Sequence, residues 1–492
     1  MRLKITESKN AKSLYVIKST YENGKHSSQI VEKLGTYTEL LEKLHGQDPI
    51  AWAKAYIADL NEKEKAGKRD VTVTFSPTKP IEKNQQVLFN GGYLFLQAIY
   101  YALCLDSISK NISKKHKFTF DLNSILSYLL YARILFPASK LATMQLVQKF
   151  LEPPSFDIQH VYRVLGIIAE ESDFIQSELY KNSLQVIDRN THILYYDCTN
   201  YFFEIEQESG LRQYGISKEH RPNPIVQMGL FMDGDGIPLA FNISKGNTNE
   251  QVTLTPLEQK LLNDFDLSKL VVCTDAGLAS TINRKFNDKK DRATKLVQKN
   301  PQKIGKCKAN DFKRFISKKS ITSAGEIAAK NWYSIDADLL RKEEMFDGYY
   351  GICTNLEDHA HSIIRINHQR WEIEESFRIM KTEFQARPVY LSRDDRIHAH
   401  FTTCFLALTL YRFLEKILDE QFTCHRIVES LRNMNFYKIK TEGYIPTYVK
   451  DDFTELLHKK FQFQTDRQII TMQEMKNIFK FTKDIGSADN FV

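Results

Sequence analysis

Three carboxylates stand out by their positions relative to predicted strands and to a predicted helix. A short apolar strand predicted over 193–196 ends at Asp197, and a second strand predicted over 270–274 ends at Asp275. Glu374 lies on a long predicted helix further along the chain. Acidic side chains at strand ends in α/β sheets are where ligand and metal sites gather. The three residues are therefore candidates for a shared site.

These carboxylates have no cysteine or histidine partner in the pattern. Oxygen ligands alone suit a hard cation, so the expected ions are Mg²⁺ or Mn²⁺ rather than zinc. Two such ions about 4 Å apart can activate a water or a 3′-hydroxyl and stabilise the leaving oxygen during attack on a phosphodiester. The pattern predicts a two-ion phosphoryl-transfer site.

The helix predicted over 363–382 carries further groups suited to this chemistry. Asn367, Arg370, Glu374 and Lys381 are spaced so that, at about 100° per residue, they fall within roughly a 60° arc of one continuous helix. Arg370 and Lys381 could hold a phosphate backbone beside the metal centre. An ion pair between Arg370 and Glu374 on a solvated helix is the alternative, worth only about 0.3–0.5 kcal/mol.

The spacing Asn367-x2-Arg370-x3-Glu374-x6-Lys381 resembles the Y-x2-R-x3-E-x6-K signature of a large group of bacterial insertion-sequence transposases. These enzymes have a ribonuclease-H-like DDE catalytic domain. The resemblance departs from the signature at Asn367, where the family has tyrosine. Asparagine can hydrogen-bond a phosphate but cannot stack on a base.

The resemblance extends to the segments around all three carboxylates, at 196–199, 275–277, 369–378 and 387–390. It implies that Asp197, Asp275 and Glu374 form the catalytic, metal-binding triad. It also implies DNA contacts for Asn367, Arg370 and Lys381. The implied partners are double-stranded DNA, as terminal inverted repeats and as target, and a second copy of the chain in a homodimeric synaptic complex.

The order of predicted elements indicates a mixed α/β catalytic core with the sequence β-β-β-α-β-α-β, an insertion, and then α. The resemblance implies that this core is ribonuclease-H-like and that the insertion is β-rich. The expected organisation is a small β-hairpin plus helix region at 1–70, a linker at 71–92, a helical domain at 93–190 for DNA-end binding, the catalytic domain at 191–383 with the insertion at about 300–362, and a mainly helical C-terminal region at 384–492.

Charge is unevenly distributed along the chain. The 492 residues carry 68 Lys and Arg against 61 Asp and Glu, a net of +7. The window 284–319 alone holds 14 Lys or Arg and three Asp, a net of +11. Such a local excess favours a phosphate-contacting surface, with a solubilising face as the alternative.

Other patterns predict where the protein resides. The longest apolar run, 93–105, spans 13 residues, too few for the ~20 needed to cross a bilayer. The N-terminus has no signal-peptide pattern, and the seven cysteines are scattered. We expect a cytoplasmic, nucleoid-associated protein with no membrane partner and reduced thiols.

One acidic motif has a simpler interpretation than metal binding. The run Asp233-Gly234-Asp235-Gly236 predicts a hairpin turn rather than a calcium loop, because Ser244 stands where such a loop needs glutamate.

The function predicted overall is a DNA transposase that cleaves the ends of its element and joins the 3′-OH ends to target DNA. The alternatives are a metal-dependent endonuclease of the same fold and a catalytically silent, transposase-derived DNA-binding protein.

Overall fold

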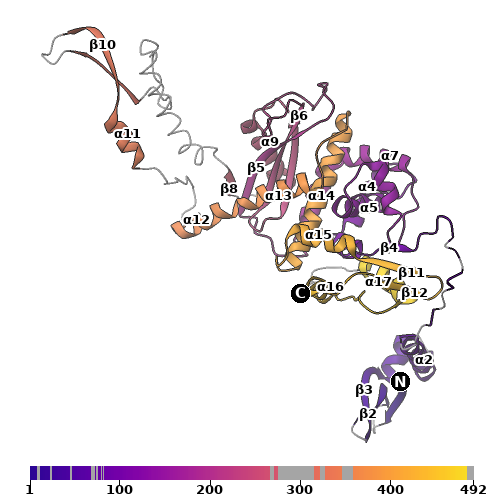
Figure 1. The fold of residues 1–492 in the computed structure, drawn as a ribbon. Coiled ribbons are helices and arrows are strands. Elements are labelled where there is room, and N and C mark those ends of the chain that lie inside the picture. The colour runs from indigo at the N-terminus through magenta and orange to yellow at the C-terminus, as the bar shows by residue number, and fades with distance from the viewer. Residues whose placement is uncertain are drawn as a thin grey trace. The chain divides into compact units, whose positions relative to one another are not determined.

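The computed structural model describes residues 1–7, 12–22, 25–44, 47–67, 72–73, 76–78, 80, 82–265, 267, 271–274, 315–321, 327–345 and 358–484. The chain divides into two compact units (Figure 1). The first comprises Met1–Val87, Lys438–Ile445 and Ile469–Met475, and the second comprises Leu88–Tyr437, Pro446–Gln468 and Lys476–Val492.

The first unit begins with a three-stranded antiparallel sheet, where the sequence predicted a hairpin. The added strand carries Leu3, which packs against the small core of Leu14, Leu40 and Ala53. Thr36 caps the first helix, since its hydroxyl accepts from the backbone N–H of Glu39. The elements are β1 (Arg2–Glu7), β2 (Lys12–Glu22), β3 (Lys25–Thr36), α1 (Tyr37–Lys43) and α2 (Pro49–Gly67). Further along, β12 (Gly443–Pro446) pairs with β13 (Ile470–Thr471).

The second unit opens with a short strand and a group of helices, in the segment predicted to be helical. Strand β4 (Leu88–Asn90) lies within the predicted linker and pairs with β11 (Asn435–Ile439). The helices are α3 (Tyr93–Ala102), α4 (Leu105–Lys115), α5 (Leu122–Leu135), α6 (Lys140–Val147), α7 (Ile158–Glu170) and α8 (Ser172–Ser183).

The long helix α14 (Asp394–Ile417) joins these helices to the central sheet of the unit. It is buried along most of its length and packs against α3, α5, α7 and α8, and also against strand β7 (Pro238–Lys245) of that sheet and helix α13 (Trp371–Thr382). The C-terminal region continues with α15 (Cys424–Asn433), α16 (Asp452–Phe461) and α17 (Met472–Asp484). In the described part of this region most residues are helical.

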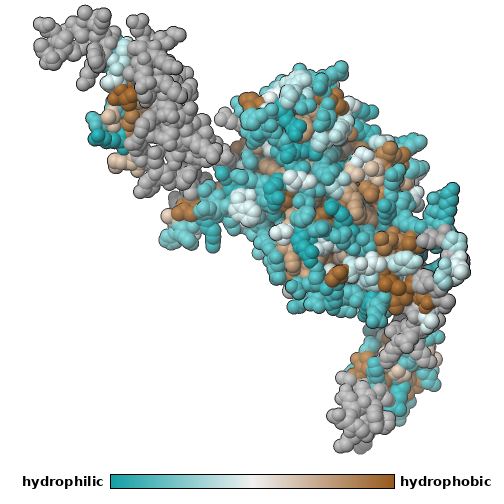
Figure 2. Space-filling model, in the orientation of Figure 1, coloured by the Kyte–Doolittle hydropathy of each residue, from teal (hydrophilic) through white to brown (hydrophobic). Residues whose placement is uncertain are grey.

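No single helix in the described ranges is long and apolar enough to cross a membrane, although α5 and α6 together pass that test as a pair bent by 94°. The surface coloured in Figure 2 is predominantly hydrophilic, with apolar spots interspersed.

A four-stranded mixed sheet forms the centre of the second unit. Its order is β7-β6-β5-β8, with β8 parallel to β5 and the other neighbours antiparallel. One face is covered by α9, whose Leu257 and Leu261 pack with Tyr196, Phe231 and Leu239 of the strands. The elements are β5 (Ile193–Phe202), β6 (Ile225–Asp233), β7 (Pro238–Lys245), α9 (Glu250–Asp264) and β8 (Val271–Thr274). Along the chain these elements follow one another as β-β-β-α-β, and the mixed α/β content agrees with the predicted fold class.

The hairpin turn between β6 and β7 lies at the predicted Asp-Gly run. Asp233 accepts from the backbone of Asp235 and of Ile237, which closes the turn. Gly236 has a φ of +77°, a backbone conformation that favours glycine, and Glu372 of α13 lies against its Cα.

The prediction that a strand ends at Asp197 is wrong, because β5 continues through this residue to Phe202. The antiparallel ladder with β6 runs without interruption from Leu194 opposite Asp233 to Phe202 opposite Ile225, with Asp197 opposite Leu230. Asp197 is therefore a mid-strand residue.

Part of the predicted insertion is described. It contains a hairpin of β9 (Ile316–Ile321) and β10 (Ile327–Ile335), followed by α11 (Ala337–Glu344). Phe315 and Leu340 form its small core. The predicted helix near 280, the strands expected at 294–298 and 349–353, and residues 284–314 of the basic window lie outside the described residues.

The single helix predicted over 363–382 is in fact two, α12 (Ala360–Gln369) and α13 (Trp371–Thr382), which meet at Arg370. In a continuous helix the Arg370 N–H would donate to the carbonyl of Ile366. That carbonyl instead lies 3.0 Å from the Tyr195 hydroxyl of β5, and the Arg370 N–H donates to Asn367 at 3.4 Å. The competing donor from the sheet accounts for the break.

Candidate active site

One face of β5 lies against α12 and α13. At one end, the Tyr195 hydroxyl donates to the carbonyl of Ile366 at 3.0 Å. Four residues further along the strand, Thr199 accepts from the Lys381 amine at 2.8 Å. Since side chains alternate across a strand, Tyr195 and Thr199 share this face. Strand and helices therefore run alongside each other in the same direction.

Asp197 lies between these two contacts on the same face of β5. It is half-buried, and its Oδ1 accepts from the backbone N–H of Cys198 at 2.7 Å. Glu374 is exposed in the first turn of α13. It precedes Lys381 by seven residues, which is about two helical turns, so both side chains leave the same side of α13. The structure thus places Asp197 on the strand face covered by the helix of Glu374 and Lys381.

The second predicted carboxylate, Asp275, lies outside the described residues. Thr274, which precedes it in sequence, is the last residue of β8 and is paired with Tyr196. The end of β8 therefore lies beside the residue that precedes Asp197.

Arg370 stands at the junction of α12 and α13 and is half-buried. The guanidinium of Arg370 lies close enough to the end of β8 to act on Cys273. Burial raises the pKa of the Cys273 thiol, and the positive charge of Arg370 opposes that rise. Asn367 is exposed on α12. Because the helix breaks at Arg370, the four signature residues do not share one uninterrupted helix.

Lys381 is held in a polar but largely enclosed position, with a side chain only 14% exposed. Burial, together with the charge of Lys218, lowers the pKa of this amine to about 8, and the charge of Asp197 opposes that shift. The amine also stands 5.4 Å from the centre of the Tyr201 ring. The electrostatic coupling indicates that Lys381 and Asp197 share one site.

Further charged residues converge here that the sequence did not single out. They come from the loop between β5 and β6 and from the chain after α13. The Lys218 amine bonds the carbonyl of Cys198 and lies 3.2 Å from Glu250. Glu219 lies 3.5 Å from the Lys381 amine and also pairs with Arg387. We call Lys218, Arg221, Lys381 and Arg387 the basic cluster. No periodicity marks the loop residues, so only their contacts in the fold reveal them.

The donor chemistry of the site fits a hard cation, since Asp197 and Glu374 offer only oxygen ligands. Within the ranges that the structure describes, no group of three or more His, Cys, Asp or Glu side chains is placed to hold a metal ion. The third predicted ligand, Asp275, is outside those ranges.

A mixed sheet whose strand carries a carboxylate toward a helix with glutamate and lysine defines a candidate phosphoryl-transfer domain. Residues 202–410 match the family model described as the transposase DDE domain. The matched range includes Asp275 and Glu374 and begins five residues after Asp197. The comparison with curated proteins gave no match. Membership in the particular group with the Y-x2-R-x3-E-x6-K signature stays a prediction.

Proposed function

We propose that this chain is a DNA transposase that binds the terminal inverted repeats of its own element, cleaves the DNA ends and joins the 3′-OH ends to target DNA. The observation that carries the proposal is the face of β5, where Asp197 lies between two contacts to the helices that present Glu374 and Lys381. The match of residues 202–410 to the transposase DDE domain supports the same activity.

In this proposal Asp197, Asp275 and Glu374 hold two Mg²⁺ or Mn²⁺ ions. When bound, the ions would activate a water or a 3′-hydroxyl and stabilise the leaving oxygen. The protein's part is to fix the two carboxylates of β5 and α13 by strand pairing and helix packing. Lys381, enclosed beside Thr199, and Arg370, near the end of β8, would hold the DNA backbone on either side of the cut.

The division of labour along the chain is also proposed. Residues 93–190 would recognise the element's ends, and two copies of the chain would hold two ends in one synaptic complex. Since α14 packs on both the helices of this segment and strand β7, end binding and catalysis would be mechanically joined. Crosslinking of terminal-repeat DNA to the full chain should map to peptides within 93–190, and crosslinks confined to other segments would refute this assignment.

The test of the function uses the purified full chain, the DNA that flanks its gene, Mg²⁺ and a target plasmid. The parent should cleave at the element's ends and join them to the plasmid. The variants Asp197→Asn, Asp275→Asn and Glu374→Gln should each lose more than about a hundredfold in cleavage, because loss of even a supporting partner of a metal site costs 10–100-fold. Their binding to end DNA without metal should stay close to that of the parent.

The control is Glu206→Gln, which removes an exposed carboxylate in the β5–β6 loop. Cleavage without joining would make the protein an endonuclease, and end binding without cleavage by the parent would make it a silent DNA-binding protein. Equal loss of binding and cleavage in the three variants would assign their carboxylates a structural role.

A further inference from the structure

One carboxylate lies among several cations at the edge of the proposed active site. The Glu219 side chain pairs with Arg387, lies 3.5 Å from the Lys381 amine and stands 3.9 Å from Nε of Arg221. Three cationic groups of the basic cluster thus surround a single acidic group. The carboxylate is 22% exposed, so the arrangement is partly shielded from solvent.

The cations are held in place by contacts other than Glu219. The guanidinium of Arg221 lies 4.4 Å from the centre of the Phe202 ring, and that of Arg387 lies 5.9 Å from the same ring. Lys381 is fixed by its bond to Thr199. Phe202 and Thr199 both belong to β5, so a strand of the sheet supports the cations independently of Glu219.

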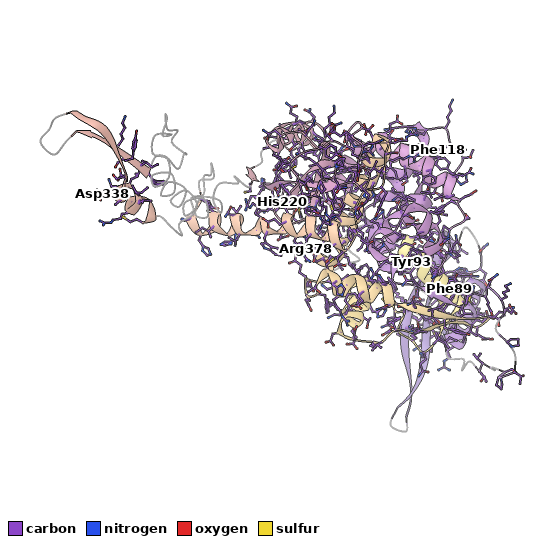
Figure 3. All side chains as sticks on the ribbon, turned by 45° about the horizontal axis from the view of Figure 1, so that its top comes forward. Phe89, Tyr93, Phe118, His220, Asp338 and Arg378 are labelled. Atoms are coloured by element: carbon purple, nitrogen blue, oxygen red, sulfur yellow. The ribbon has the colours of Figure 1, made fainter. Side chains whose placement is uncertain are left out.

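The loop that carries Glu219 is itself anchored on β5. The side chain of Asn200 donates to the carbonyl of Ile216 at 3.1 Å and accepts from the Lys218 N–H at 3.3 Å. Ser217 accepts from the backbone N–H groups of Glu219 and Arg221 at 3.3 and 3.2 Å. These bonds hold the loop at the place where its carboxylate meets α13. Figure 3 labels His220, next to Glu219, and Arg378 on α13, which locate the loop and the helix.

A carboxylate and a backbone phosphate present the same recognition features to these cations. Both carry a negative charge, and both offer two oxygens that a planar guanidinium can bind together. The four cations of the basic cluster face three acidic side chains, Glu219, Glu250 and Asp197, so an excess of one positive charge remains that a phosphate could satisfy.

We propose that Glu219 occupies a binding site for one backbone phosphate of DNA and leaves it when DNA binds, so that Arg221 and Arg387 join Lys381 as phosphate contacts. The inference rests on the proposed function, since it assigns DNA as the ligand. Glu219 then competes with the DNA phosphate for these cations. This competition weakens binding to random-sequence DNA, which makes no sequence-specific contacts to offset it.

The experiment measures binding of the full chain to a labelled random-sequence duplex at low salt, in EDTA so that no cleavage occurs. Glu219→Gln should bind about two- to tenfold tighter than the parent, because one or two partly exposed ion pairs no longer compete with the phosphate. Glu206→Gln, which removes the same charge from the same loop outside the basic cluster, should bind like the parent. Introducing Arg387→Gln together with Glu219→Gln should abolish the gain.

A second readout requires no DNA. Inorganic phosphate should raise the melting temperature of Glu219→Gln more than that of the parent, because the emptied site takes the free anion. The inference is overturned if Glu219→Gln binds DNA no better than Glu206→Gln, or if its gain persists in the Arg387→Gln background.

The two levels of proposal fail separately. If Lys381→Ala weakens DNA binding while Glu219→Gln changes nothing, the competitor role is wrong and the proposed function stands. If Lys381→Ala leaves both the affinity and its salt dependence unchanged, the assignment of DNA to this cluster is wrong.

Discussion

The turn between β6 and β7 is anchored by a buried ion pair whose removal should weaken the whole mixed sheet. Nε of Arg189 lies 2.6 Å from Oδ2 of Asp233, with side chains only 1% and 0% exposed. Arg189 also donates to Ser183 and to the carbonyl of Ile237, while Asp233 accepts from the backbone of Asp235 and of Ile237. The pair thus ties the end of α8 to the hairpin.

The change Asp233→Ala would leave the guanidinium of Arg189 buried without its counter-charge and leave two backbone donors without their acceptor. Loss of one partner of a buried pair costs about 3–5 kcal/mol, against a total stability of about 5–15 kcal/mol. At about 2.1 cal/mol/K of unfolding entropy per residue, a unit as large as this one (Leu88–Tyr437, Pro446–Gln468 and Lys476–Val492) shifts by about 1.2 °C per kcal/mol, so the melting temperature should fall by about 4–6 °C.

The assay is thermal unfolding followed by circular dichroism. The matched control is Glu178→Gln, whose carboxylate pairs with Lys181 at 3.0 Å on the surface of α8 and should contribute less than about 1 kcal/mol. The double change Arg189→Met with Asp233→Leu should recover much of the loss, because it leaves no buried charge. If Asp233→Ala melts within about 2 °C of Glu178→Gln, the pair does not anchor the sheet and the reasoning fails.

Two further predictions follow from single side chains. Lys381→Ala should make the slope of log DNA affinity against log salt concentration shallower by nearly one unit, as measured by titrating DNA binding with salt. As a control, Lys459→Ala, which removes an exposed lysine of α16, should leave the slope unchanged. Burial and the charges of Arg133 and Lys140 hold the pKa of His400 well below 6.5, so below about pH 6.5 the unfolded chain binds a proton that the folded chain does not. Stability should therefore fall with decreasing pH by up to about 1.4 kcal/mol per pH unit, and His400→Gln should flatten the plot of melting temperature against pH; an unchanged plot would contradict this.

Local chemistry explains which parts of the fold could be predicted. The Asp-Gly run at 233–236 closes a hairpin through its own side chain and a glycine with positive φ, and Thr36 caps the helix that follows it. Both depend on residues within four positions of one another. The local sequence alone is therefore enough to predict turns and helix caps of this kind.

The break at Arg370 could not be predicted because its cause lies far away in sequence. The Tyr195 hydroxyl that binds the Ile366 carbonyl is 171 residues distant. The helical pattern around Arg370 is continuous, so nothing nearby signals an interruption. The ion pair of Glu219 could not be predicted for the same reason. Its partner Lys381 is distant in sequence and comes close only because α13 packs on β5.

The position of Asp197 depends on the register of one strand. Even-numbered residues of β5 pack toward α9; the hydroxyl of Tyr196, for example, hydrogen-bonds to Thr253. Odd-numbered residues such as Thr199 face α13. A slip of one residue would exchange the two faces and turn Asp197 into the apolar core. The uninterrupted ladder with β6 fixes the observed register, in which Leu194 and Tyr196 lie in the core against α9. The core packing that stabilises the sheet is thus the same feature that directs the candidate catalytic carboxylate toward the helix of Glu374.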